Sequence, residues 1–137
     1  MEIIHLEKLD DDLTKLIVKG FEAQSLKKGI DTNYNPFAFV AKEGADVLGI
    51  CYGNTAFDEI YIDTLIITEG HRNKKIGTKL INEVEMYFRN KGYLQINLST
   101  MGFQAKGFYE KMGYTLEYTR VHKSNPKLTR YFMIKYY

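Results

Sequence analysis

The chain has 137 residues, of which 45% are hydrophobic, and this length and composition predict one compact domain over residues 1–137. A formal net charge of +2 is too small to indicate nucleic-acid binding, which normally needs a basic face. The sequence contains no run of about 18 apolar residues, so we expect no membrane span. Its first residues, MEIIHLEKLDDD, are too acidic for a secretory signal, so we expect a cytoplasmic protein. We expect it to be a monomer or a homodimer.

The first half of the chain predicts a strand, a helix and three further strands. Residues 2–6 form the first predicted strand, and residues 10–12, three aspartates, cap a helix that ends near Gly29. Three strands joined by hairpin turns follow, at 37–42, 47–55 and 59–68. The apolar residues of the helix fall on one face, and they are Leu13, Leu16, Ile17 and Phe21.

The second half predicts a strand-helix-strand unit, a short helix and two final strands. An apolar stripe at 3.6-residue spacing predicts a helix over 78–91, which Gly92 ends. The later elements are a strand at 94–99, a helix at 104–112 that stops at Gly113, and strands at 114–121 and 129–136. This order predicts an α+β fold, a mixed sheet with helices on both faces and a right-handed parallel crossover over residues 59–99.

Cysteine and histidine usage indicates neither a disulfide nor a metal site. Cys51 is the single cysteine of the sequence, so no intrachain disulfide can form. His5, His71 and His122 are far apart in the sequence, and no cysteine and histidine have the spacing of metal ligands. We therefore expect no metal.

A basic loop, HRNKKIGT, connects the strand at 59–68 to the helix at 78–91. A strand that leads into a helix N-terminus leaves unpaired N–H groups and the positive end of the helix dipole at one place, where an anion can bind. Arg72, Lys74 and Lys75 add positive charge there. The alternative is an ordinary surface turn with solvated lysines.

Two segments resemble the GNAT superfamily of acetyl-CoA-dependent N-acetyltransferases. Residues 72–77, RNKKIG, resemble its pyrophosphate loop, [Q/R]-x-x-G-x-[G/A], in which Arg72 and Gly77 match. Lys75 stands at the first glycine of that pattern and Asn73 replaces another, which is compatible with binding if the loop has right-handed turns. Residues 105–114, AKGFYEKMGY, resemble the A-x-x-(F/L)-Y-x-x-x-G-(F/Y) segment of the family. Gly102 occupies a position where the family often has Asn, and Gln104 is expected to replace that contact.

The resemblance implies a mostly antiparallel mixed sheet of six to seven strands, in which two parallel strands splay apart to hold acetyl-CoA. It assigns coenzyme contacts to the end of the strand before the loop, to the loop with the first helical turn, and to the downstream helix. These residues are Leu65, Ile66, Ile67, Arg72, Asn73, Lys74, Lys75, Ile76, Gly77, Thr78, Gln104 and Phe108.

The implied reaction is aminolysis of a thioester, which needs a group to take a proton from the attacking amine. Glu59, Tyr61 and Asp63 alternate onto one face of their strand, where the family commonly places its base. Asp63 is the first candidate and Glu59 the second. Either carboxylate could instead be a solvent-facing residue, Asp63 could bind a cationic substrate by charge, and an ordered water could serve as the base.

The resemblance places Tyr109 beside the coenzyme sulfur as the general acid that protonates the leaving thiolate. Its helical spacing also puts it on an apolar face, so Tyr109 could simply be a core residue. A backbone N–H within residues 65–67 would meet the oxyanion.

The acceptor is a small-molecule or peptide amine that the sequence does not identify further. In this fold the acceptor pocket would draw on aromatic and histidine side chains, with Tyr34, Tyr52, Tyr61 and His122 as candidates. Two other functions stay open, a non-catalytic acyl-CoA sensor or structural partner, and a nucleic-acid-binding domain built around HRNKK.

Overall fold

The computed structural model describes residues 1–71 and 75–137. Contacts divide the chain into two units, residues 1–32 and residues 33–137, and each unit is described by itself. None of the described helices is long and apolar enough to cross a membrane.

The N-terminal unit contains helix α1 (Asp11–Lys27). Asp10 is its N-cap, and a side-chain oxygen of Asp10 accepts a hydrogen bond from the backbone N–H of Leu13 at 2.8 Å. Gly29 follows the helix with a φ of +71°, a left-handed conformation that suits glycine at a helix end. The predicted helix is therefore confirmed. The predicted strand at residues 2–6 is wrong, because these residues pair with none of the described strands.

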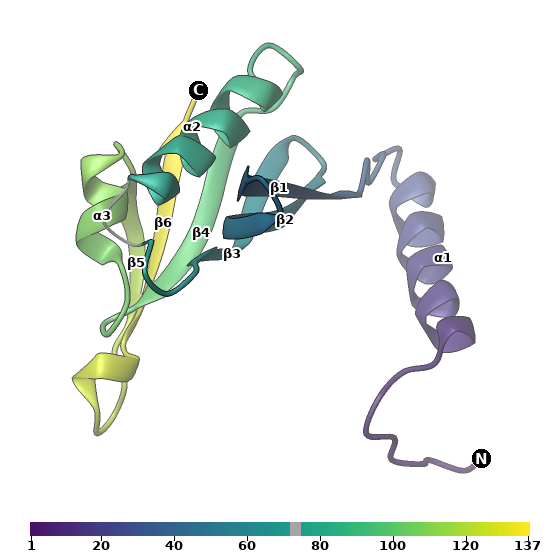
Figure 1. The fold of residues 1–137 in the computed structure, drawn as a ribbon. Helices are drawn as coiled ribbons and strands as arrows, with labels where there is room; N and C mark the ends of the chain where they lie inside the picture. The colour runs from purple at the N-terminus through teal and green to yellow at the C-terminus, as the bar shows by residue number, and fades with distance from the viewer. Residues whose placement is uncertain (72–74) are drawn as a thin grey trace. The chain divides into compact units, whose positions relative to one another are not determined.

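The second unit is built on a six-stranded sheet with the strand order β1-β2-β3-β4-β6-β5 (Figure 1). Among these pairs only β3 and β4 are parallel, so the predicted mixed, mostly antiparallel sheet of an α+β fold is confirmed. The strands are β1 (Asn35–Glu43), β2 (Asp46–Ala56), β3 (Glu59–Ile67), β4 (Gln95–Met101), β5 (Thr115–Arg120) and β6 (Arg130–Tyr136).

The parallel strands β3 and β4 separate partway along their length. They pair only where Glu59–Ile62 runs beside Gln95–Leu98, although β3 continues to Ile67 and β4 to Met101. The backbone edge of β3 that faces β4 is therefore left unpaired by β4 after Ile62. This is the splayed strand pair that the family resemblance implied.

A β-bulge at Asp63 interrupts β3 at the same place. Ile62 is opposite Gly53 and Thr64 is opposite Tyr52, so Asp63 has no residue opposite it on β2. A bulge of this kind bends a strand and re-aims its side chains.

The bulge changes which residues of β3 point into the core. Ile60 and Ile62 are buried, 0% and 2% exposed, before the bulge. After it, Leu65 and Ile67 pack against the core, so the inward positions change from even to odd numbers. The alternation that places Glu59, Tyr61 and Asp63 on one face therefore does not continue past Asp63.

Helices α2 (Ile76–Phe88) and α3 (Lys106–Lys111) pack against one face of the sheet. Four residues of the apolar stripe predicted for α2 are buried there, Leu80, Ile81, Val84 and Phe88, together with Ile76. The fifth predicted residue of the stripe, Tyr87, is 55% exposed. Tyr109 of α3 joins the same hydrophobic core. After α3, Gly113 has a φ of +95°, as its predicted role at the helix end requires.

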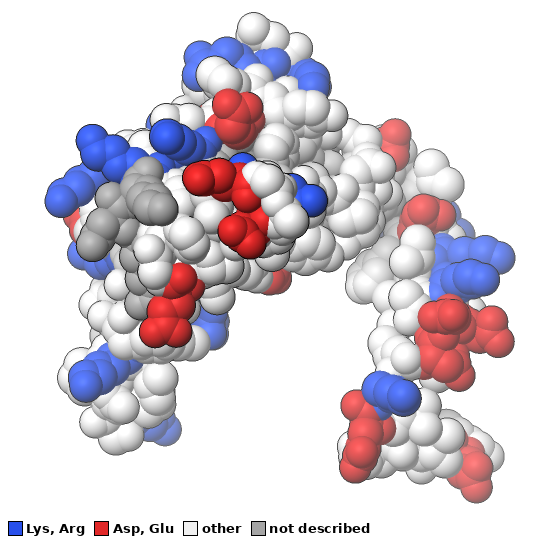
Figure 2. Space-filling view, in the orientation of Figure 1, with Lys and Arg blue, Asp and Glu red and all other residues white. Residues whose placement is uncertain are grey.

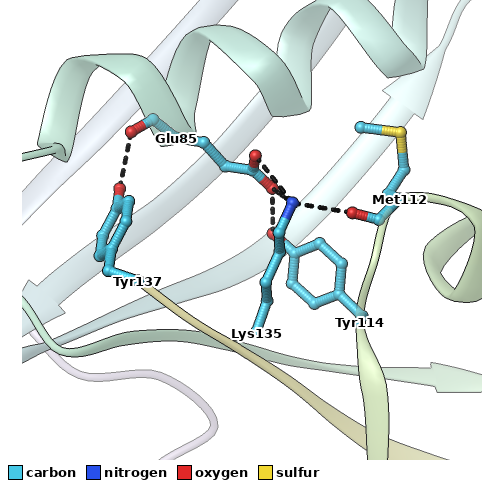
Figure 3. Close-up of polar contacts among 5 residues, drawn as sticks. All are labelled: Glu85, Met112, Tyr114, Lys135 and Tyr137. Atoms are coloured by element: carbon cyan, nitrogen blue, oxygen red, sulfur yellow. Dashed lines mark hydrogen bonds and ion pairs between the residues drawn. The ribbon is translucent and has the colours of Figure 1, made fainter.

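A polar network joins α2, the end of α3 and the C-terminal strand (Figure 3). Glu85 of α2 accepts hydrogen bonds from Lys135 and from the hydroxyl of Tyr114, the latter at 3.2 Å. Lys135 also donates to the carbonyl oxygen of Met112 at 2.8 Å. The hydroxyl of Tyr137 donates to the backbone carbonyl of Glu85 at 2.7 Å. These bonds fix the two helices that border the site relative to each other.

Candidate active site

Two cavities of the second unit meet at the splayed end of β3 and β4. The first, which we call the β3–β4 cavity, has a volume of about 490 Å³ and is lined by the two strands, residues 103–105, Tyr109 and Arg130. The second, the α2–α3 cavity, has a volume of about 370 Å³ and is lined by β3 and by both helices. Leu65, Ala105 and Tyr109 line both cavities, which are therefore neighbours at these residues.

Tyr109 is buried, with 7% of its side chain exposed, between the aromatic rings of Phe108 and Tyr114. The ring centroids lie 5.1 Å from Phe108 and 5.7 Å from Tyr114, in edge-on arrangements. Burial raises the pKa of Tyr109 to about 12, and the nearby Cys51 adds to this effect. Tyr109 therefore keeps its proton at neutral pH, and it lines both cavities.

Asp63 and Glu59, the two carboxylates proposed as base, lie in different surroundings. Asp63 is exposed and lines the β3–β4 cavity, where its carboxylate accepts a hydrogen bond from the hydroxyl of Thr64 at 2.7 Å. Glu59 lies at the other end of β3, where it accepts a hydrogen bond from Gln95 at 3.2 Å, and it lines neither cavity. Asp63, and not Glu59, therefore shares a cavity with Tyr109.

The α2–α3 cavity contains most of the described residues that the sequence assigned to the coenzyme. Its lining includes Leu65, Ile67, Lys75, Gly77, Thr78 and Phe108. A Cβ atom on Gly77 would lie 3.4 Å from the ring of Phe108, so a larger side chain at this position would lie against that ring in the cavity wall. The cavity thus combines a helix N-terminus with a lysine at its edge, which suits an anionic ligand.

Two of the isoleucines predicted to contact the coenzyme lie elsewhere. Ile76 is 5% exposed and belongs to the core beneath α2, so its side chain is not available to a ligand. Ile66 lines the β3–β4 cavity instead, because the bulge at Asp63 reverses the faces of β3 beyond it.

Lys75 is the N-cap of α2 and has a left-handed backbone, with φ of 55° and ψ of 28°. The right-handed turns under which the substituted loop is compatible with coenzyme binding are therefore not present at this residue. Lys75 stands where the family pattern has glycine, and its conformation is the one that glycine adopts most easily. Three further predicted contacts, Arg72, Asn73 and Lys74, lie outside the described residues.

The segment between β4 and α3 differs from the family pattern at Gly102. A Cβ atom there would lie 2.5 Å from the carbonyl oxygen of Pro126, so no larger residue fits without a shift. The side-chain oxygen of Gln104 accepts a hydrogen bond from the N–H of Met101 at 2.9 Å. Gln104 therefore closes its own turn and lines the β3–β4 cavity, whereas the sequence assigned it to the coenzyme.

Of the four residues predicted to bind the acceptor, Tyr61 lines the β3–β4 cavity. Tyr34 and Tyr52 line neither cavity, and their side chains are 55% and 45% exposed. His122 lies in the loop after β5, where its Nδ1 atom accepts hydrogen bonds from the N–H groups of Ser124 and Asn125. The structure therefore does not bring these four residues together.

Sequence reasoning missed several polar residues of the β3–β4 cavity, among them Ser99 and Arg130. The guanidinium of Arg130 donates a hydrogen bond to the hydroxyl of Ser99 at 3.0 Å, across the β4–β6 pair. The available signal was a charged residue at the start of an otherwise mostly aromatic and apolar strand. Figure 2 shows basic and acidic side chains interspersed over the surface formed by α2 and α3.

Comparison with known proteins identifies the family. The model of the Acetyltransferase (GNAT) family matches residues 6–114. The chain is 26% identical over 98 residues to the blasticidin-S acetyltransferase of Streptomyces morookaense, which is 71% of each protein. An acetyltransferase structure from Bacillus cereus has 25% identity and a TM-score of 0.76, with 98% of both chains covered. The structure of an aminoglycoside 6'-N-acetyltransferase with coenzyme A has 16% identity and a TM-score of 0.65, covering 99% of this chain and 97% of that one. The protein is therefore an acetyltransferase of the GNAT family.

Proposed function

We propose that this protein transfers the acetyl group of acetyl-CoA to a primary amine of a small molecule or peptide. The observation that carries the proposal is the meeting of two cavities at Tyr109. The α2–α3 cavity, with Lys75, Gly77 and the N-terminus of α2, suits the phosphates and the arm of the coenzyme. The β3–β4 cavity, with Asp63 and Tyr61, suits an amine.

Acetyl-CoA supplies a thioester, and in the reaction a C–N bond forms with the amine while the C–S bond breaks. The unpaired edge of β3 after Ile62 offers N–H groups to the carbonyl oxygen and to the coenzyme arm. Asp63 attracts the protonated amine and takes its proton, directly or through water. Proximity of amine and thioester at the junction supplies much of the rate.

Tyr109 donates a hydrogen bond to the leaving sulfur. Because its pKa is raised to about 12, the phenol is a weaker acid than a thiol, whose ordinary pKa is about 8.5. If Tyr109 transfers its proton to the sulfur, the phenolate must at the same time receive a proton that the amine has released. The net result is that a proton of the amine ends on the sulfur. A protonated amine releases two protons in all: one leaves through Asp63 to water and the other ends on the sulfur. Atoms and charge then balance, and the phenol is regenerated in each turnover.

The experiment that tests the proposal has two readouts on the same protein. Acetyl-CoA should raise the melting temperature, because a ligand that binds only the folded state stabilises it by RT ln(1 + [L]/Kd). Free thiol should appear when amines are added, in a panel of polyamines, aminoglycosides, amino acids and peptides. Stabilisation without thiol release from any amine would favour a non-catalytic acyl-CoA sensor.

A pair of glycine variants tests the position of the coenzyme. Gly77→Glu places a negative charge and added bulk beside Phe108 and should abolish the acetyl-CoA shift. Gly107→Glu adds the same side chain to α3, where a Cβ meets nothing within 4 Å, and should leave the shift intact. An equal response of the two variants would contradict binding in the α2–α3 cavity.

A further inference from the structure

Two arginines stand opposite each other at the end of the β5–β6 pair. Arg120 of β5 and Arg130 of β6 are register partners in this antiparallel pair, so their side chains project from the same face. Directly opposed residues have Cβ atoms about 5 Å apart, and two like charges in such a pair destabilise the sheet. The fold thus keeps two positive charges together at a cost in stability.

Each guanidinium is held in place by a neutral neighbour. The Nη1 atom of Arg130 donates to the hydroxyl of Ser99 at 3.0 Å. The guanidinium carbon of Arg120 lies 5.3 Å from the ring centroid of Phe132, within the range of a cation–π contact. Phe132 is itself packed against Tyr118, with ring centroids 5.8 Å apart. Both arginines are therefore oriented before any ligand binds.

No carboxylate of the described residues forms an ion pair with either arginine. Over residues 1–71 and 75–137, the ion pairs within 4.0 Å join Lys106 to Glu110 and Lys135 to Glu85. Most of the hydrogen-bonding capacity of the two guanidiniums is thus open to a ligand. A planar guanidinium binds carboxylates through paired hydrogen bonds, and two of them make a strong carboxylate site.

Arg130 lies on the side of the site that is away from the proposed coenzyme phosphates, and Arg120, which lines neither cavity, is its register partner on β5. Arg130 lines the β3–β4 cavity together with Asp63, whereas Lys75 and Gly77 line the α2–α3 cavity. Asp63 and Arg130 are not paired with each other. One cavity therefore presents a negative group and a positive group to the same ligand.

We propose that Arg120 and Arg130 bind a carboxylate of the acceptor, so that the acceptor is an aminocarboxylate whose amine lies near Asp63 and Tyr109. This inference rests on the proposed acetyl transfer and specifies its substrate class. The carboxylate fixes one end of the acceptor at β6, and the amine then reaches the junction of the two cavities.

The test compares matched acceptors of increasing length. The acceptors are the ω-amino acids glycine, β-alanine, 4-aminobutyrate and 6-aminohexanoate. Each is paired with the n-alkylamine that has a methyl group in place of the carboxylate and the same number of methylene carbons. Thiol release from acetyl-CoA is followed for each. We expect at least one amino acid to have a kcat/KM at least 10-fold above that of its alkylamine. The chain length that is preferred measures the separation of the two subsites.

Variants then assign the effect to the arginines. Arg130→Gln and Arg120→Gln should each raise KM for the preferred amino acid by about 10- to 100-fold with little change in kcat. Each variant loses charged hydrogen bonds that hold the substrate and the transition state equally well, and such a loss raises KM alone. Neither variant should alter the KM for the matched alkylamine. Lys42→Gln removes one positive charge from the other edge of the sheet, on β1, and should change neither value.

A readout independent of turnover accompanies the kinetics. With coenzyme A present, 4-aminobutyrate or 6-aminohexanoate should raise the melting temperature of the parent and of Lys42→Gln, but not of Arg130→Gln. Alkylamines acetylated as well as their amino acid partners, or amino acids that neither bind nor react, would overturn the carboxylate subsite. If acetyl-CoA itself failed to bind or no amine of any class released thiol, the proposed acetyl transfer would fail instead.

Discussion

The ammonium of Lys135 lies 3.1 Å from both carboxylate oxygens of Glu85, a side chain that is almost fully buried beneath α2 (Figure 3). The same ammonium donates to the carbonyl oxygen of Met112 at the end of α3. Lys135 of the last strand thus pairs with a buried carboxylate and holds the end of the helix that carries Tyr109 by a hydrogen bond.

Lys135→Met should lower the free energy of unfolding by about 3 kcal/mol or more, because it leaves the Glu85 carboxylate buried without its partner. Lys106→Met is the matched control, since it removes a partner of Glu110 in an exposed pair four residues apart on α3. That change should cost less than about 1 kcal/mol. Urea unfolding of both variants measures the difference, and equal costs would contradict a structural role for the buried pair.

Lys75→Gly should raise the free energy of unfolding by about 0.5–1 kcal/mol, because it relieves a left-handed backbone that a side chain disfavours. Lys79→Gly removes the same charge from an exposed position inside α2 and should lower the stability by about 1 kcal/mol. Thermal unfolding without coenzyme compares the two. A loss of stability in Lys75→Gly would mean that the side chain of Lys75 contributes more than its backbone strain costs.

Gly53→Ala should destabilise the protein by at least about 2 kcal/mol, since the added Cβ would lie 2.0 Å from the carbonyl oxygen of Tyr61. Gly53 stands across from the bulge, so relief requires a shift of β3 at Asp63. Gly107→Ala meets nothing within 4 Å and should be neutral or stabilising in α3. Chemical denaturation tests this, and a mild effect of Gly53→Ala would show that the bulge adapts freely.

Stability should fall as the pH rises from about 9 toward 12. Burial raises the pKa of the Cys51 thiol from 9.0 to about 12 and that of Tyr109 from 10.0 to about 12, and it also raises the pKa of Tyr114. In this window the folded state holds protons that the unfolded chain releases, so deprotonation favours unfolding. Below about pH 9 these groups do not change the free energy of unfolding.

Cys51→Ala isolates the thiol in the same measurement. The variant loses stability at every pH because it leaves a small cavity, but its decline between pH 9 and pH 10 should be shallower than that of the parent. Denaturant midpoints measured across the pH range give the two slopes. Identical slopes for the parent and for Cys51→Ala would show that deprotonation of the Cys51 thiol does not contribute to the loss of stability at high pH.

Much of the fold follows from local patterns in the sequence. The Asp10 cap and Gly113 after α3 each set a helix boundary through short-range chemistry. The apolar stripe indicated the helix α2, although this helix spans Ile76–Phe88 and not the predicted residues 78–91. The AKGFYEKMGY segment likewise located Tyr109, because it depends on a short helix of fixed spacing. These predictions needed no knowledge of distant contacts.

The features that the sequence did not reveal depend on pairing between distant segments. The bulge at Asp63 is defined by Gly53 on another strand, so period-two alternation along β3 could not indicate it. Arg120 and Arg130 come together only through the register of β5 and β6. Residues 2–6 have a strand-like composition but pair with none of the described strands.

The most direct measurement compares turnover and stability in Tyr109→Phe and Tyr114→Phe, with an amine that releases thiol from acetyl-CoA. The Tyr114 hydroxyl bonds to Glu85 and lines neither cavity, so its loss should lower stability and leave kcat unchanged. Tyr109→Phe keeps the ring between Phe108 and Tyr114 but removes the phenol at the junction of the cavities. We predict that kcat falls by about 10²-fold or more, with stability and acetyl-CoA binding nearly unchanged. A Tyr109→Phe variant as active as the parent would contradict it and would leave Tyr109 as a core residue.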